Sequence, residues 1–169
     1  MTSGEESSKV GNRETKRLRV SRRVLRGFAP EHFKSLRIDA GLSRGELGRI
    51  ADVSEGAIRA WEVGEAVPQV DTLDRVMTAL GRPISEVVQV RADDRYLADL
   101  RVLAGLTQPQ LAQRAGCSTA QLAAVERAHR PLKEPLLTNI AAALGTDKSV
   151  VDAAYTRTRR RPPTPRPMP

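Results

Sequence analysis

Residues 36–43 read Leu-Arg-Ile-Asp-Ala-Gly-Leu-Ser, and residues 100–107 read Leu-Arg-Val-Leu-Ala-Gly-Leu-Thr. The two stretches lie 64 residues apart, and the same offset aligns residues 36–88 with residues 100–152 without a gap at 16 identical positions. Self-similarity at one fixed offset is typical of a duplicated structural unit. The sequence therefore predicts that one small domain occurs twice in the chain.

Both stretches carry the signals that end one helix and begin the next. Gly41 and Gly105 follow apolar residues at helical spacing, and glycine readily takes the left-handed conformation that closes a helix. A second helix is predicted to begin directly afterwards, because a hydroxyl residue and a Glu or Gln three positions later can satisfy each other's backbone N–H groups. These capping pairs are Ser43 with Glu46 and Thr107 with Gln110.

A short turn is predicted to lead into a third helix in each repeat. Ser54 and Ser118 are favourable first caps for this helix, and Asp52 or Gly116 can take the left-handed conformation in the turn before it. Apolar spacing of three and four predicts the buried face. That face comprises Ala57, Ile58 and Trp61 in the first repeat and Gln121, Leu122 and Val125 in the second, with Gln121 at its edge.

Two further helices are predicted in each repeat. The fourth spans residues 71–80 and 135–144 and is closed by Gly81 or Gly145, and the fifth spans residues 84–88 and 148–155. Aromatic residues make up only 3% of the chain, which favours helices over a β-sandwich or barrel. The predicted fold class is all-α, with two tandem five-helix domains and basic disordered tails.

The positive charge is concentrated at the two ends of the chain. The net charge is +8 overall, residues 1–26 hold eight basic and three acidic residues, and residues 157–169 hold five basic and no acidic residues. The remainder is slightly acidic. We therefore expect a partly disordered basic arm over 1–30, domains over 31–90 and 91–156, and an Arg/Pro-rich disordered tail over 157–169. Such tails favour a polyanionic partner, nucleic acid above all.

Several classes of protein are excluded by what the sequence lacks. No apolar run is long enough for a membrane span, and no signal peptide is expected. The single cysteine, Cys117, cannot form an internal disulfide, and with His32 and His129 it provides no zinc-ligand set. No phosphate-binding glycine motif or nucleophile with a histidine base is present. The expectation is a cytoplasmic, non-enzymatic protein without metal or cofactor, and its 23 arginines against five lysines indicate a GC-rich bacterial or phage genome.

The order of helices and caps resembles the lambda-repressor-like helix-turn-helix domains, also called the XRE or Cro/C1 family. The resemblance covers roughly residues 33–90 and 96–155. It is carried by the Leu-Arg-x-x-Ala-Gly-Leu-(Ser/Thr) stretches and by the pairs Leu47 and Leu111, Ser54 and Ser118. The ordered set occurs twice, which makes the resemblance specific.

The resemblance implies which residues face DNA. In this family the third helix lies in the major groove with its N-terminal side chains at base edges, and the second helix begins near a phosphate. The implied base-reading residues are Ser54, Glu55, Gly56 and Arg59 in the first repeat and Ser118, Thr119, Ala120, Gln121, Ala123 and Ala124 in the second. The implied phosphate contacts are Arg44, Gln108 and, in the basic arm, Arg17, Arg19, Arg22 and Arg23.

Three of these side chains have chemistry suited to particular bases. The Arg59 guanidinium can bond O6 and N7 of guanine together, Gln121 can pair with adenine, and Glu55 can accept from cytosine. By the same resemblance, two ion pairs are expected to be structural and to join the first helix to the end of the third. They are Arg37 with Glu62 and Arg101 with Glu126. Trp61 could stack on a base, but its apolar spacing favours a place in the core.

Two functions of different classes follow from this interpretation. The favoured one is a sequence-specific regulator of transcription, more often expected to be a repressor than an activator. Its expected partner is double-stranded DNA, and a homodimer is a possible oligomeric state. The alternative is a protein-interaction module of antitoxin or adaptor type, whose tails give only non-specific affinity for nucleic acid. The slightly acidic body and the alanine-rich third helix of the second repeat keep this alternative open.

Overall fold

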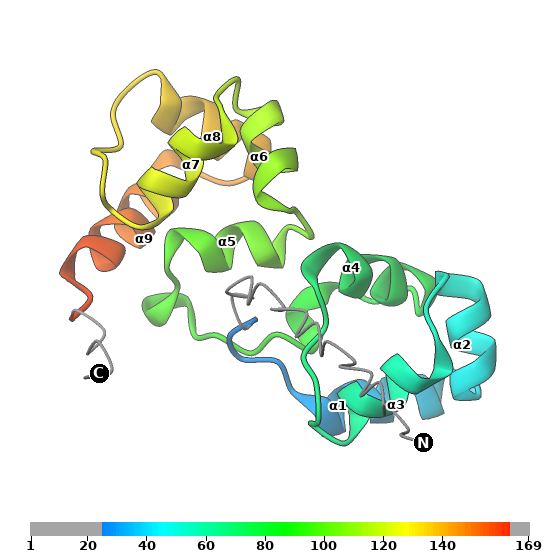
Figure 1. The fold of residues 1–169 in the computed structure, drawn as a ribbon. Helices are drawn as coiled ribbons and strands as arrows, with labels where there is room; N and C mark the ends of the chain where they lie inside the picture. The colour runs from blue at the N-terminus through cyan, green and yellow to red at the C-terminus, as the bar shows by residue number, and fades with distance from the viewer. Residues whose placement is uncertain (1–24, 163–169) are drawn as a thin grey trace, which may run out of the picture.

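The computed structural model describes residues 25–162, and these residues form helices and short turns without a strand (Figure 1). The all-α prediction is therefore confirmed for the described part of the chain. The first repeat contains α1 (Pro30–Asp39), α2 (Arg44–Ala51), α3 (Glu55–Glu62), α4 (Val70–Ala79) and the 3-10 turn η1 (Ile84–Glu86). The second contains the 3-10 turn η2 (Ala92–Asp94), α5 (Leu97–Leu103), α6 (Gln108–Arg114), α7 (Thr119–Glu126), α8 (Leu136–Leu144) and α9 (Lys148–Arg160).

Local hydrogen bonds fix where α2 and α6 begin. The Ser43 hydroxyl accepts from the Glu46 backbone N–H at 3.1 Å, and the Glu46 carboxylate accepts from the Ser43 backbone N–H at 2.8 Å. Thr107 and Gln110 form the same reciprocal pair at the start of α6. Both predicted capping boxes are thus confirmed.

The turns into the third helix of each repeat also follow the prediction. Asp52 and Gly116 take the left-handed conformation, with φ of 55° and 66°. The hydroxyl of Ser54 accepts from the Ala57 backbone N–H at 3.2 Å, and that of Ser118 accepts from the Gln121 backbone N–H at 3.1 Å. Each hydroxyl satisfies an N–H group that the helix itself leaves unpaired.

Each repeat has its own hydrophobic core. In the first, Phe33 and Ile58 are fully buried, and Trp61 packs edge-on against Phe33 with ring centroids 6.1 Å apart. In the second, the aliphatic Leu97 and Leu122 are buried at the positions equivalent to Phe33 and Ile58. The prediction that Trp61 belongs to the core is confirmed, and no described helix has the length and apolar character to cross a membrane.

The fifth helices differ from the prediction in both repeats. Residues 84–88 do not form a full helix, because the chain makes only the turn η1 before Val88 pairs with Phe28 in an isolated antiparallel bridge. Conversely, α9 runs to Arg160, so the Arg159–Arg161 run predicted as extended tail is helical up to Arg160. The reason is tertiary packing: the buried Thr158 hydroxyl lies 3.3 Å from the Leu97 backbone N–H at the start of α5 and accepts from it.

The boundary of the predicted arm also shifts. Residues 25–29 lie against the folded domains: Leu25 is buried in the first core, and the Ala29 N–H donates to the Val87 carbonyl at 2.8 Å. The Arg26 guanidinium lies 4.5 Å from the centroid of the Tyr96 ring, and that of Arg161 lies 5.4 Å from the same centroid. The two ends of the described chain therefore meet at one aromatic ring.

Substituting Gly48 with alanine is expected to destabilise the first domain by about 1–3 kcal/mol, because an added methyl group would collide with the Val53 carbonyl oxygen between α2 and α3. This strain outweighs the gain of about 1 kcal/mol in helix propensity. The equivalent Ala112 is buried in α6, so Ala112→Gly should instead lose about 1–2 kcal/mol, through lower helix propensity and the loss of a buried methyl group. Urea unfolding measures both values, and a stabilised Gly48→Ala variant would contradict the prediction.

Candidate nucleic-acid interface

The start of α3 presents the first set of predicted reading residues. Ser54, Glu55, Gly56 and Arg59 are all exposed, while Ile58 on the opposite side of the helix is fully buried. Gly48 lets the turn before α3 pack closely on α2, since a methyl group at this position would collide with the Val53 carbonyl oxygen. The turn thus holds one exposed helix face away from the core.

Arg59 has a partner that the sequence reasoning missed. Its Nη1 lies 3.0 Å from the Glu65 carboxylate in the loop between α3 and α4, and both side chains are more than half exposed. An exposed pair of this kind contributes little to stability, about 0–1 kcal/mol. The guanidinium is therefore held by an interaction that is weak enough to exchange for another anion or acceptor.

The start of α7 carries the second set and has less chemistry to offer. Ser118, Thr119 and Ala120 are exposed, and Gln121, Ala123 and Ala124 are half-buried. Ser118 already caps the helix, so Thr119 and Gln121 remain as the side chains of this set able to hydrogen-bond a base. The alanines offer only methyl groups, which suit apolar contact with thymine.

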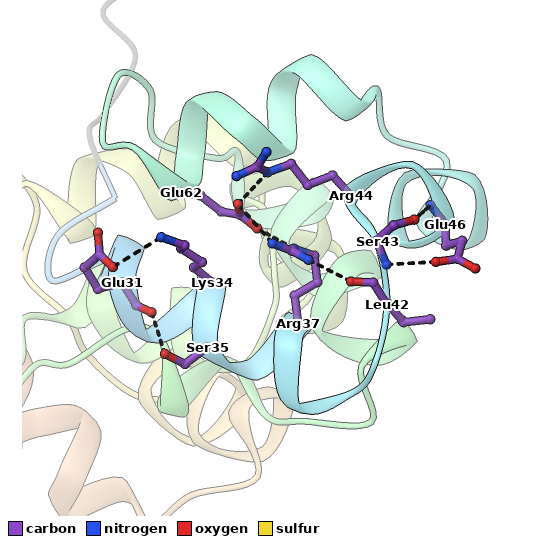
Figure 2. Close-up of polar contacts among 9 residues, drawn as sticks. All are labelled: Glu31, Lys34, Ser35, Arg37, Leu42, Ser43, Arg44, Glu46 and Glu62. Carbon is purple, nitrogen blue, oxygen red and sulfur yellow. Dashed lines mark hydrogen bonds and ion pairs between the residues drawn. The ribbon is translucent and has the colours of Figure 1, made fainter.

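A buried charge network ties α3 to the two helices before it, as Figure 2 shows. Glu62 is 1% exposed and accepts from Arg37 Nε at 2.5 Å and Nη2 at 3.3 Å, and from Arg44 Nε at 2.6 Å. Arg37 also donates to the Leu42 carbonyl at 2.7 Å. Two guanidinium groups from α1 and α2 therefore converge on one carboxylate at the end of α3.

The second repeat builds the same arrangement with one substitution. Arg101 Nε donates to Glu126 at 2.6 Å and Arg101 Nη1 donates to the Leu106 carbonyl at 2.8 Å, as at the equivalent positions of the first repeat. Gln108 donates to Glu126 at 2.5 Å in place of Arg44. Arg44 and Gln108, expected near phosphates, are thus each bonded to the carboxylate that orients the third helix.

The remaining predicted residues either lie outside the described residues or are isolated. Arg17, Arg19, Arg22 and Arg23 lie outside residues 25–162. Within that range no group of three or more His, Cys, Asp and Glu side chains could hold a metal ion, and both histidines are exposed. Burial raises the pKa of the half-buried Cys117 thiol, which makes it a poor nucleophile.

The Glu62 carboxyl has a lowered pKa. Burial by itself raises the pKa of this group, but the hydrogen bonds from Arg37 and Arg44 and the charges of these two residues outweigh burial and bring the pKa below the ordinary value of 4.5. The charged form is therefore the one that the folded protein stabilises.

Stability is expected to fall on acidification below about pH 4.5. A carboxyl whose pKa is lower in the folded state contributes stability above its unfolded pKa and loses it as the pH falls through the folded value. The midpoint of urea unfolding should accordingly be level between about pH 7 and 5 and then decrease. Glu62→Gln, which cannot titrate, should show a smaller decrease relative to its own value at neutral pH. An equal decrease would assign the effect to other carboxyls, such as Glu46 and Glu134, whose pKa values are also lowered.

Two short helices joined by a tight turn, the second capped and exposed at its start, define a helix-turn-helix unit, and the chain contains two of them. Comparison with protein families agrees with this assignment. Residues 33–87 match the family model described as "Helix-turn-helix", of the XRE/Cro-C1 type, and residues 95–154 match the model described as "Helix-turn-helix domain". The chain therefore carries two tandem helix-turn-helix domains, a type that suggests DNA binding. No curated protein and no solved structure matches it significantly.

Proposed function

We propose that the chain binds double-stranded DNA in a sequence-specific manner through α3 and α7 and regulates transcription as a repressor, without enzymatic activity, metal or cofactor. The observation that supports this most is the repeated geometry of the two units. In each, a serine cap and a carboxylate anchor fix a helix whose first turn is exposed. A helix presented in this way can enter the major groove with its N-terminal side chains at base edges.

In this proposal α3 and α7 differ in the base contacts that their side chains can make. Arg59 reads guanine through O6 and N7, with Glu55 in position to accept from cytosine. On α7, Gln121 pairs with adenine and the alanines contact thymine methyl groups. Arg59 must break its ion pair with Glu65 to reach a base. Glu65 therefore competes with DNA for the Arg59 guanidinium, and weak binding to a random sequence does not break the pair.

Phosphate contacts come from two sources. The N–H groups at the start of α2 face the phosphates of DNA, and Arg44 extends from this helix with a side chain 35% exposed. The start of α6 offers fewer N–H groups, because Pro109 has none and the Gln110 N–H donates to the Thr107 hydroxyl. Gln108 has the equivalent place on α6. The arginines of the basic arm add contacts that carry no sequence information. We place the protein in the cytoplasm, on the nucleoid when bound, with a homodimer as one possible assembly.

Arg59→Ala is the variant that tests this proposal. A duplex is first selected from a randomised pool with the full chain at about 0.15 M salt, a strength that screens loose attraction to the tails. The variant should lose about 1–3 kcal/mol of binding free energy on the selected duplex and little on a scrambled one. Arg82→Ala is the matched control, because Arg82 is equally exposed and paired with Glu86 but lies beyond α4. Glu65→Gln should strengthen binding to the selected duplex.

Equal losses on both duplexes would reduce Arg59 to a phosphate contact. If the full chain enriches no sequence, the proposal fails and the alternative gains: a helix-turn-helix protein-interaction module. One observation favours that alternative in advance. The loop after α3 exposes Val63 and Val67, at 50% and 40%, beside the face that would otherwise meet DNA.

A further inference from the structure

Helix α5 packs on both hydrophobic cores. Leu97 and Leu100 are buried in the second core, whereas Val102 and Leu103 are partly buried against the first. The helix also contacts η1 of the first repeat, and Figure 1 shows it lying between the two domains. One helix is therefore a component of two packed cores.

The end of α5 fits closely against α4. Gly105 is buried, and a methyl group added to it would collide with the Asp74 carboxylate. The equivalent glycine of the first repeat, Gly41, has nothing within 4 Å of the same position. The close approach therefore belongs to the contact between the domains and is not a general property of the repeat.

Comparison of the two repeats supports the same conclusion. The residues equivalent to Val102 and Leu103 are Ile38 and Asp39, and both are exposed, Ile38 at 55%. The second repeat thus has a leucine where the first has an aspartate, and this is the position that another domain covers. The outer face of α5 is an interface that the outer face of α1 does not form.

The segment before α1 makes a second connection between the domains. Leu25 is buried in the first core, and the next residue, Arg26, donates to the Asp94 carbonyl and lies 3.3 Å from the Asp99 carboxylate of α5. The chain between η1 and α5 is also held in place, because Arg157 of α9 donates to the Arg95 carbonyl at 2.9 Å. Little of the chain between the two domains is left free to bend.

From these contacts we infer that the two domains form one rigid unit, and that the chain reads a two-part DNA site whose halves have one fixed spacing and rotational phase. The fixed spacing of the DNA site rests on the proposed function, whereas the rigidity of the two domains does not. In B-DNA each inserted base pair moves the halves apart by about 3.4 Å and rotates them by about a tenth of a turn. A rigid pair of reading helices cannot follow such a change.

The rigidity is tested without DNA. Spin labels are placed at two exposed equivalent positions, Arg49→Cys and Gln113→Cys, in a Cys117→Ser background, and the distance between them is measured by pulsed electron paramagnetic resonance. One narrow distance distribution is expected. Leu103→Asp should broaden it, and Arg26→Ala should do so to a lesser degree. Ile38→Asp, on the exposed face of α1 beside Asp39, the equivalent of Leu103, is the control and should leave the distribution unchanged.

Leu103→Asp gives the second repeat the residue that the first repeat has at this position, so the domain itself is expected to fold. Circular dichroism checks this, while Trp61 fluorescence reports whether the first domain stays folded. Arg26→Ala provides a second uncoupled variant if Leu103→Asp does not fold. The inference would be overturned if the distance distribution were broad in the protein with an unaltered interface. It would also be overturned if neither Leu103→Asp nor Arg26→Ala changed the distribution.

The fixed spacing of the DNA site is tested with the selected duplex and a series of duplexes that have one to ten base pairs inserted between the two half-sites. The intact chain should lose about tenfold or more in affinity at the first insertions and recover no affinity at ten. Leu103→Asp should bind the original duplex less tightly and depend less on spacing. Failure to bind any duplex would contradict the proposed function and leave the distance result standing. Tight binding at every spacing would contradict the fixed-spacing inference alone.

Discussion

Glu62→Ala is expected to lower the free energy of unfolding by about 3–5 kcal/mol. The carboxylate is 1% exposed and accepts hydrogen bonds from Arg37 and Arg44. Its removal leaves the buried Arg37 guanidinium without its counter-charge, and the cost of an uncompensated buried charge exceeds the net value of the pair itself. The substitution also frees the end of α3, so weaker DNA binding should accompany the loss of stability.

Urea unfolding followed by tryptophan fluorescence measures this loss, since Trp61 is the only tryptophan in the chain and lies in the affected domain. Glu65→Ala serves as the control, because Glu65 also pairs with an arginine but both partners are exposed. It should cost less than about 1 kcal/mol. Similar losses in the two variants would show that burial of the Glu62 network adds nothing to its stability.

Phe33→Ala is the second substitution with a large expected effect, also about 3–5 kcal/mol. Phe33 is fully buried, and its ring lies 5.9 Å from that of Phe28 and 6.1 Å from that of Trp61, centroid to centroid. It connects the segment before α1 to α3. Removal of the ring leaves a cavity at the point where these three elements meet.

Phe33→Leu is the informative comparison, because Leu97 occupies the equivalent position of the second repeat. The loss of volume is smaller, and a cost below about 1.5 kcal/mol is expected. The same unfolding experiment orders the two variants. A Leu variant as unstable as the Ala variant would mean that the contacts between the aromatic rings, and not the filled volume, stabilise this core.

The sequence was most informative where structure depends on neighbouring residues. The capping boxes at Ser43 and Thr107, the serine caps of α3 and α7 and the left-handed Asp52 are all decided within about four residues. The helical spacing likewise predicted Ile58 and Trp61 as buried. These signals also occur twice, so that each repeat served as a check on the other.

Features that depend on distant residues were predicted less well. The last turn of α9 looked like a tail by composition, and it is helical because Thr158 is buried against the start of α5. Residues 84–88 had the apolar pattern of a helix, but the pairing of Val88 with Phe28 ends the turn early. Neither partner is close in sequence, so local patterns carried no sign of either contact.

The candidate site was predictable in position but not in its pairings. The exposed starts of α3 and α7 followed from the caps and the apolar spacing. The bond from Arg59 to Glu65 was missed, although an acidic residue six positions after a helical arginine was a signal that could have been tested. The contact between the domains was visible only in a difference between the repeats, Leu103 against Asp39.

Arg26 and Arg161, near opposite ends of the described residues, both contact the aromatic ring of Tyr96. Proteins whose termini lie close together commonly tolerate circular permutation. A short peptide joining the two ends would close residues 25–162 into a ring, and a cut in the exposed loop after α3 would then open it at a new place. The order in which the helices are synthesised is thus separable from the arrangement in which they pack.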